Sequence, residues 1–352
     1  MNIRIVLVLV SLVLSLVTGI VLSRGGSSGS TAKGKAKGKV VIGFSMDTLK
    51  EERWQADKRM FTEKAEALGA EVLVQSANSD DVRQVQDIEA LISRNVDVLV
   101  IIPHNAEAMA TGVEKAHQVG IPVISYDRLI KNADVDLYIS FDNYRVGEEQ
   151  AKALVALLPG GKGKIIRIYG AKTDNNAAQF KEGQDRIILP LVKSGDIQVI
   201  HEDWTEGWKP ENAKRITQAA IAAHGTSFDG ILASNDGTAG GAIQTLTEEG
   251  LAGKIPVTGQ DAELSACQRI IAGTQAMTIY KPIHVIATAA AGLAVDLARR
   301  KPIIARTAVP NGKGDIPTNF LDIQVVTKDN MRDTIIRDNY HPEAEVYKGA
   351  AK

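Results

Sequence analysis

The chain has 352 residues, enough for about two domains of ordinary size. Its hydrophobic content of 44% and charged content of 24% are typical of a globular protein, and they argue against disorder and against a polytopic membrane protein. The formal net charge is only -1, and no basic stripe with interleaved aromatics is present, so we expect no nucleic-acid partner. The single cysteine, Cys267, excludes an intrachain disulfide and a CxxC redox pair.

The first residues predict export. Arg4 precedes an uncharged apolar run from Ile5 to Leu22, and Ser23 is a small residue suited to cleavage. We expect residues 1–23 to be a signal peptide that directs the protein to the periplasm, with an uncleaved membrane anchor as the alternative. Residues 24–39 contain only Gly, Ser, Ala, Thr and basic residues, which predicts a flexible linker.

From Val40 onward, short apolar runs alternate with segments of helical period, which predicts a parallel sheet covered by helices. Residues 40–44 read as the first strand, and residues 98–102 read as a strand buried on both faces. The intervening helices are predicted from their apolar faces, and Gly69 ends the first of them. These faces consist of Trp54, Phe61, Ala65 and Leu68 in the first helix and Val82, Val85, Ile88, Leu91 and Ile92 in the second.

The two halves of the chain repeat one pattern. The run Ile121-Pro122-Val123 is followed by Asp127, and Ile255-Pro256-Val257 is followed by Asp261 with the same spacing. Each aspartate falls just past the carboxyl end of a strand, where open parallel sheets bind ligands. Two similar lobes that face each other would direct both aspartates into one cleft. The alternative is that each aspartate only caps a following helix.

The usual local signatures of an enzyme do not occur. No G-x-S-x-G elbow is found, and the glycine-rich segments at 160–164 and 237–241 lack the spacing of a phosphate loop or a dinucleotide fingerprint. The six histidines are scattered and form no H-E-x-x-H pair. We therefore expect no catalytic residues, no metal site and no cofactor.

The residue types at the predicted strand ends suit a neutral sugar. A sugar has two apolar ring faces and a rim of hydroxyls, so its site needs aromatics above and below and polar groups around it. Hydrogen bonds with one ionised partner contribute about 1.5–3 kcal/mol each, against about 1 for neutral pairs. The candidates in these loops are Arg53, Trp54, Asp127, Arg128, Asp174, Asn176, Trp208, Asn235, Asp261 and Lys281.

Between about Val40 and His341 the sequence resembles the periplasmic D-xylose-binding proteins of the type I sugar-binding class. The motifs that carry the resemblance are Glu52-Arg53-Trp54-Gln55, Gln75-Ser76-Ala77-Asn78, Val96-Asp97-Val98-Leu99, Tyr126-Asp127-Arg128, Phe141-Asp142-Asn143, Asp174-Asn175-Asn176-Ala177, Gly207-Trp208, Ala233-Ser234-Asn235-Asp236, Gly259-Gln260-Asp261 and Tyr280-Lys281-Pro282.

The resemblance implies a role for each candidate residue. Trp54 and Trp208 would sandwich the pyranose ring, while the other eight residues hold its hydroxyls. Three of these residues also have a purely structural alternative: Trp54 could belong to the core, Asp174 could be only a helix cap, and Lys281 could be a surface residue.

The resemblance also implies the architecture. The fold class is α/β, with two Rossmann-like lobes, each a parallel sheet flanked by helices, joined by a three-strand hinge. The hinge strands would cross near Phe141, near Lys281-Pro282 and around Asn311 to Ile316. The N-terminal lobe would comprise residues 40–141 and 282–312, the C-terminal lobe residues 142–281 and 313–341, and the last residues, 342–352, a tail.

The function implied is that of a binding protein, not an enzyme. It would close around D-xylose or a related monosaccharide and then dock on an ABC transporter permease, with a chemoreceptor as a further candidate partner and the protein itself a monomer. The alternatives are a binding protein for glucose, ribose or arabinose, a membrane-tethered sugar sensor, and an enzyme that acts on sugars. A sugar-responsive transcription regulator would need a DNA-reading helix pair where this chain has a leader and linker.

Overall fold

The computed structural model describes residues 38–349, and the residues from Val40 onward form one compact unit. The expected signal peptide, and the linker up to residue 37, lie outside the described residues. No helix within residues 38–349 is both long and apolar enough to cross a membrane.

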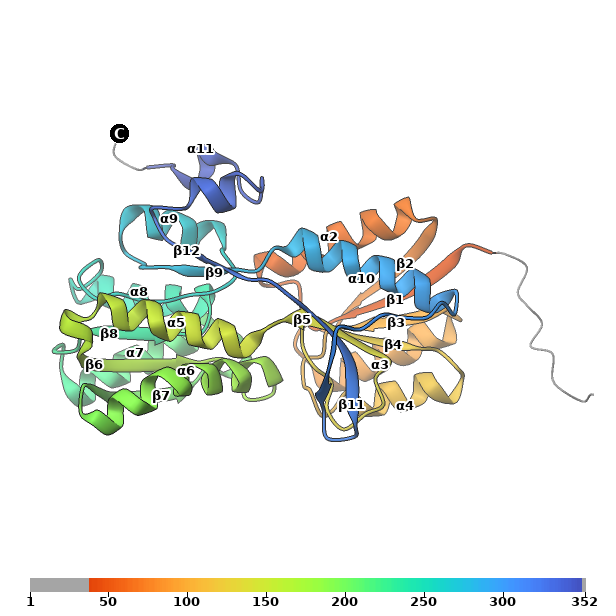
Figure 1. Ribbon diagram of the computed structural model, residues 1–352, viewed down its shortest axis with the longest axis horizontal. Coiled ribbons are helices and arrows are strands. Elements are labelled where there is room, and N and C mark those ends of the chain that lie inside the picture. Colours follow the sequence, from red (N-terminus) through yellow and green to blue (C-terminus); the bar gives the residue numbers. More distant parts are fainter. Residues whose placement is uncertain (1–37, 350–352) are drawn as a thin grey trace, which may run out of the picture. The chain divides into compact units, whose positions relative to one another are not determined.

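The N-terminal lobe is built on a seven-stranded sheet in the order β10-β11-β5-β4-β3-β1-β2 (Figure 1). Its strands pair in parallel, except that the edge strand β10 runs antiparallel to β11. The strands are β1 (Val40–Met46), β2 (Ala70–Ser76), β3 (Val98–Ile101), β4 (Val123–Tyr126), β5 (Leu137–Phe141), β10 (Thr307–Pro310) and β11 (Asp315–Leu321).

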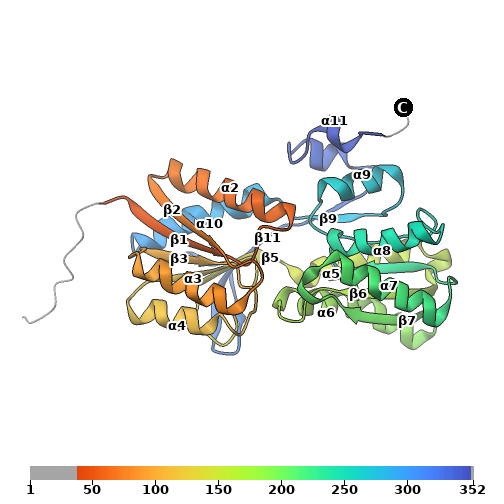
Figure 2. The ribbon, with the colours of Figure 1, turned by 180° about the vertical axis from the view of Figure 1, so that it is seen from behind.

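Helices cover both faces of this sheet. Figures 1 and 2 show α2 (Glu52–Ala67) and α10 (Ile283–Ala298) on one face, and α3 (Asp81–Ser93) and α4 (Ala110–Gln118) on the other. Successive residues of β3 accordingly enter different cores: Val98 and Val100 pack with α2 and α10, whereas Leu99 and Ile101 pack with α3 and α4. This two-sided burial is why the strand is apolar at every position.

The predicted helix faces agree with the structure apart from one residue. Trp54, Phe61 and Ala65 are buried on α2, and Ile88 and Leu91 are buried on α3. Val82, which was expected on the buried face of α3, is 68% exposed, because it lies in the first turn and the inward position there belongs to Gln84.

The C-terminal lobe has a three-stranded parallel sheet in the order β7-β6-β8 and a two-stranded antiparallel pair, β12-β9. Between them Val257 forms an isolated bridge to Ile231 of β8, and Gly259 O accepts from Ile279 N of β9. This lobe's sheet is therefore less continuous than that of the N-terminal lobe. Its strands are β6 (Gly163–Tyr169), β7 (Ile197–Trp204), β8 (Gly230–Ala233), β9 (Thr278–Tyr280) and β12 (Gln324–Val326).

Helices again enclose the strands of this lobe. One core lies between the three-stranded sheet and helices α7 and α8, and another lies between that sheet and helices α5 and α6. The helices and short turns are α5 (Asn143–Leu157), η1 (Pro159–Gly161), α6 (Asn175–Ser194), η2 (Glu206–Trp208), α7 (Pro210–His224), α8 (Asp236–Glu248), α9 (Leu264–Ala272), η3 (Arg332–Ile336) and α11 (Glu343–Val346).

The chain passes between the lobes three times, and the third crossing differs from the prediction. The first two lie where expected, between β5 and α5 and between β9 and α10 (Figure 1). The expected crossing at 311–316 is wrong: Asn311 lies in the turn of the β10–β11 hairpin, and β11 pairs with β5 in the N-terminal sheet. The third crossing instead joins β11 to β12 at residues 322–323, so the expected boundary at 312 is also wrong.

The expected tail at 342–352 is wrong for the part that the structure describes. Residues 343–346 form α11, and Val346 is 1% exposed in a cluster with Cys267 and Ile270 of α9. An amphipathic segment of this length leaves little periodic signal in the sequence, and the packing against α9 stabilises it.

Candidate functional site

The two repeated aspartates occupy equivalent corners. Asp127 follows β4, and Asp261 follows the extended segment at Val257. Both have positive φ, 59° and 95°, and the backbone N–H of each donates to a strand carbonyl, Ile139 O or Ile279 O, at 2.8 Å. Asp is among the residues that most readily adopt this conformation. Neither caps a helix, since no helix follows Asp127 directly and the N-cap of α9 is Glu263.

Two buried cations join these corners. Arg53, from the first turn of α2, donates to Asp127 Oδ2 at 2.8 Å and to Asp261 Oδ1 at 3.4 Å. Lys281, at the second crossing, lies 3.1 Å from Asp261 Oδ1 and 3.8 Å from Asp127 Oδ2. All four residues are at most 6% exposed. Burial alone raises the pKa of Asp127, but Arg53, Lys281 and Arg128 outweigh it and hold this pKa below its usual value.

A second layer of the N-terminal lobe orients Arg53. Its Nε donates to Asp57 Oδ2 at 3.3 Å, and Asp57 also accepts from the Tyr126 hydroxyl. Burial raises the pKa of Asp57 to about 6, because the single cation Arg53 offsets only part of the desolvation. Burial alone lowers the pKa of Arg53, but Asp127, Asp57 and Asp261 raise it well above its ordinary value, so Arg53 remains charged.

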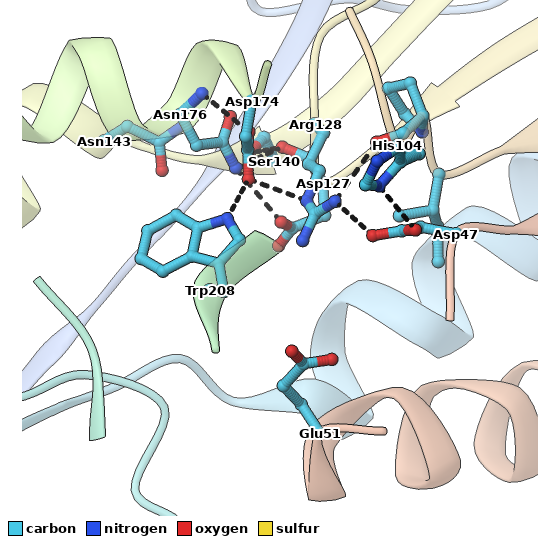
Figure 3. Close-up of polar contacts among 12 residues, drawn as sticks. Asp47, Glu51, His104, Asp127, Arg128, Ser140, Asn143, Asp174, Asn176 and Trp208 are labelled. Carbon is cyan, nitrogen blue, oxygen red and sulfur yellow. Dashed lines mark hydrogen bonds and ion pairs between the residues drawn. The ribbon is translucent and has the colours of Figure 1, made fainter. Parts of the chain in front are cut away.

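Arg128 connects the two lobes on another side of the site (Figure 3). Its Nη1 donates to Asp47 Oδ2 at 2.7 Å, and its Nε pairs with Asp174 Oδ2 of the C-terminal lobe at 2.8 Å. His104 Nδ1 lies 2.9 Å from the other oxygen of Asp47. The hydrogen bond to Asp47 raises the pKa of His104. Burial alone raises the pKa of Asp47, but His104 and Arg128 outweigh burial and hold this pKa below its usual value.

The two indoles come from different lobes. Trp54 follows Arg53 on α2 and is 3% exposed, with the guanidinium carbon of Arg53 4.1 Å from its ring centre. Trp208 ends η2, is 7% exposed and donates from Nε1 to Asp174 Oδ2 at 3.1 Å. It rests on the backbone of Gly170, where an added Cβ would lie 2.0 Å from the ring. The sandwich of a pyranose between these rings stays a prediction.

Three further candidate residues lie at the N-terminal ends of helices. Asp174 is the N-cap of α6, and Asn176 Nδ2 reaches back to Asp127 Oδ1 at 3.1 Å. Asn235 is the N-cap of α8 in a capping box with Thr238. The structural alternatives are thus partly correct: Asp174 caps a helix but also contacts Arg128, and Trp54 belongs to a core but also lines the site. Lys281 is not a surface residue, being 2% exposed.

All ten candidate residues line one cavity with an empty volume of about 330 Å³, including its opening to solvent. Three further lining residues, Glu51, Phe180 and Gln260, are absent from the sequence-based set. Glu51 lies two residues before Arg53, and Gln260 immediately precedes Asp261, so closeness in sequence to a candidate was the available signal. Phe180 lies one turn after Asn176 on α6, which marks the same helix face.

The charges of the site nearly balance. The ten candidate residues include three cations, Arg53, Arg128 and Lys281, and three carboxylates, Asp127, Asp174 and Asp261, and Glu51 adds a fourth carboxylate to the lining. A site of this composition offers charged donors and acceptors side by side, which suits a neutral polar ligand. Within residues 38–349, no group of three or more His, Cys, Asp or Glu is arranged to hold a metal ion.

Comparisons with known proteins agree with this geometry. Residues 42–302 match the family model of the periplasmic binding protein domain. The chain is 48% identical to the D-xylose-binding periplasmic protein of Escherichia coli (88% of this chain, 93% of that protein) and 46% identical to that of Haemophilus influenzae (87% and 92%). A solved solute-binding protein of a carbohydrate transporter from Chloroflexus aurantiacus, in complex with D-glucose, matches with a TM-score of 0.83 and 31% identity (88% of this chain, 98% of that chain). The chain therefore belongs to the family of periplasmic binding proteins.

Proposed function

We propose that this protein captures D-xylose in the cleft between its lobes and delivers it to an ABC-type sugar permease. The observation that carries the proposal is the group formed by Arg53 and Lys281 with Asp127 and Asp261, which draws charged groups from both lobes around one small cavity. The identity of 46–48% to proteins named for D-xylose supports the choice of ligand. The match to a D-glucose complex is at 31% identity, so glucose is the weaker candidate.

The energetics permit useful affinity. A pentose has ten heavy atoms, and small ligands reach at most about 1.5 kcal/mol of binding free energy per atom. A micromolar dissociation constant needs about 8.2 kcal/mol, which lies well inside that limit. Hydrogen bonds to the ionised groups of the site, formed away from water, supply such energy.

The mechanism is hinge closure. Sugar binds to one lobe, the other lobe completes the contacts, and the closed form is the one a permease or a chemoreceptor recognises. The contacts that Arg53, Arg128 and Lys281 make across the lobes support closure, because each has carboxylate partners in both lobes. No covalent step is involved, so incubation with pentoses should leave the sugars unchanged.

A thermal-shift panel followed by calorimetry tests the ligand. D-xylose at 100 times its dissociation constant should add about 2.7 kcal/mol of stability, and D-glucose, D-ribose and L-arabinose should add less at the same concentration. Flat responses to every pentose would reject D-xylose. A larger response to glucose than to xylose would move the assignment to a hexose.

The mode of export needs its own test, because the leader lies outside the described residues. We propose that the leader is cleaved and that the protein acts as a free periplasmic monomer. Mass spectrometry of the mature N-terminus should find a chain that begins near Ser23 or Arg24. A full-length N-terminus in the membrane fraction would instead favour the tethered sensor.

A further inference from the structure

Three acceptor atoms at the cavity have no partner. Glu51 Oε2, Asn176 Oδ1 and Gln260 Oε1 are buried and accept no hydrogen bond within the described part of the chain. The Glu51 side chain is 11% exposed, and Asn176 and Gln260 are each 2% exposed. All three residues line the cavity. A buried acceptor without a hydrogen bond destabilises the folded protein, so three of them at one cavity indicate a donor that comes from outside the protein.

Three of the acceptors expected from the sequence, those of Asp127, Asp174 and Asn235, are already engaged by the protein. Asp127 accepts from Arg53 on Oδ2 and from Asn176 on Oδ1, while Asp174 accepts from Trp208 on Oδ2 and from the Asn176 backbone on Oδ1. The Asn235 side-chain oxygen accepts from the Thr238 backbone. These groups chiefly orient the cations, so they leave a ligand fewer unoccupied acceptors than their number suggests.

No capping hydrogen bond occupies the unpaired oxygen of Glu51. It is the N-cap of α2 but makes no side-chain cap hydrogen bond, and its other carboxylate oxygen pairs with Lys50 at 3.1 Å. Figure 3 shows its carboxyl group pointing from the start of α2 toward Trp208 and Arg128. Gln260 precedes Asp261 in the C-terminal lobe, so the unoccupied acceptors of Glu51 and Gln260 lie on opposite sides of the cleft.

We propose that Glu51 and Gln260 each accept a hydrogen bond from a ligand hydroxyl, one from each lobe, and that they determine specificity for a fully hydroxylated sugar. The inference rests on the proposed function, since it assigns two further binding residues to that same site. A site built to pair with a hydroxyl discriminates strongly against the analogue that lacks it, because the buried acceptor is then left unpaired. Deoxy sugars are thus the ligands that these two residues reject.

The test combines side-chain variants of the protein with deoxy derivatives of the sugar, so that each acceptor can be matched to one hydroxyl. Glu51→Met and Gln260→Met remove the acceptors and keep unbranched side chains of similar length. Glu63→Met, at an exposed position of the same helix, and Gln198→Met, at an exposed position of β7, are the matched controls. Calorimetry would measure the dissociation constants of each protein for D-xylose and for its monodeoxy derivatives, and circular dichroism would verify that each variant is folded.

We expect Glu51→Met to weaken D-xylose binding at least about tenfold and Gln260→Met about fivefold, with both controls within about twofold of the wild type. For each variant, one particular monodeoxy sugar that binds weakly to the wild type should bind the variant almost as well as D-xylose does. Dissociation constants within twofold of the wild type for both variants, or an equal loss for every sugar, would overturn the inference. A wild-type protein that binds no sugar would overturn the proposed function instead.

Discussion

The corners at Asp127 and Asp261 share a backbone conformation but differ in how firmly they are held. The Asp127 carbonyl accepts from the Tyr138 hydroxyl at 3.0 Å, from the Ser140 hydroxyl and from Asn176 Nδ2 at 3.2 Å. The Asp261 carbonyl accepts a single long hydrogen bond, 3.4 Å, from the Tyr340 hydroxyl. The Asp127 carbonyl is thus part of a buried polar network, whereas at the C-terminal corner the short polar contacts fall on the next residue, Ala262, whose N–H donates to Thr278 Oγ1 and whose carbonyl contacts His341 Nε2.

This difference suggests that the two lobes contribute differently to the site, the N-terminal lobe as a preformed wall and the C-terminal lobe as an adjustable one. Arg53 and Asp57 extend the N-terminal network behind the site, and the conformation of this wall is fixed before a ligand arrives. A rigid wall lowers the entropic cost of binding, and the C-terminal corner, whose Asp261 carbonyl has fewer hydrogen bonds, can adjust as the lobes close. A substitution at the N-terminal corner should therefore reduce both stability and binding, whereas one at the C-terminal corner should reduce mainly binding.

The largest effect is expected for Asp127→Ala. Removal of one partner from a buried ion-pair group typically costs about 3–5 kcal/mol, and here Arg53 and Lys281 lose their shared carboxylate. Urea unfolding should show a loss of about 3 kcal/mol without ligand, and calorimetry should show sugar affinity reduced about a hundredfold or more. An unfolding free energy equal to that of the wild type would remove the contrast between the corners.

Asp261→Ala should weaken binding by at least about 2 kcal/mol, because the ligand and Lys281 both lose a buried partner. Its effect on the unfolding free energy of the unliganded protein should be clearly smaller than that of Asp127→Ala. The same two measurements apply. Unchanged affinity in calorimetry would reject the role of Asp261. A stability loss equal to that of Asp127→Ala would contradict the claim that the N-terminal corner contributes more to stability than the C-terminal corner.

The wall formed by Trp208 can be displaced without a change in charge. In Gly170→Ala the new methyl group would overlap the indole, so Trp208 must move, at a cost of about 1–2 kcal/mol in stability and a clear loss of sugar affinity. Gly292→Ala on α10 is the control, because an added Cβ there meets no atom within 4 Å. Tryptophan fluorescence and calorimetry would detect the shift. Gly170→Ala with the affinity of the control would show that Trp208 does not contact the ligand.

The smallest effect concerns pH. The folded-state pKa of His104 is raised above its ordinary value of 6.5, so the stability it contributes is full below that pH and is lost as pH rises through the raised pKa. The stability difference between the wild type and His104→Gln should thus be larger at pH 6 than at pH 9, by less than about 1 kcal/mol. Thermal unfolding at both pH values measures it, with the exposed His284→Gln as control. A difference that grows with pH would contradict the assigned ion pair with Asp47.

The site was predictable to the extent that its residues follow strand ends. The repeated Ile-Pro-Val…Asp pattern located Asp127 and Asp261, because the carboxyl ends of parallel strands converge on one edge. Glu51 and Gln260 were missed, since a glutamate before a helix and a glutamine in a loop are typical of surfaces. The contact of Arg53 with Asp261 spans 208 positions and depends on how the lobes meet, which no local pattern encodes.

The hinge shows a different case, in which a local signal was present. The turn at Asn311 was predicted as a crossing, whereas it is the turn of the β10–β11 hairpin. Asn311 is 1% exposed and donates to Ile130 O and Ala133 O, while Gly312 has a φ of 94°. Asn-Gly is a strong hairpin signal, so the turn chemistry favoured the observed topology over the expected one.

A crystal structure of the protein with D-xylose tests the central claim most directly, because the claim is that both lobes hold one sugar. The account predicts the pyranose ring between Trp54 and Trp208, with its hydroxyls within hydrogen-bond distance of charged groups from each lobe. A sugar bound to one lobe alone, or outside the cavity that Asp127 and Asp261 share, would contradict it.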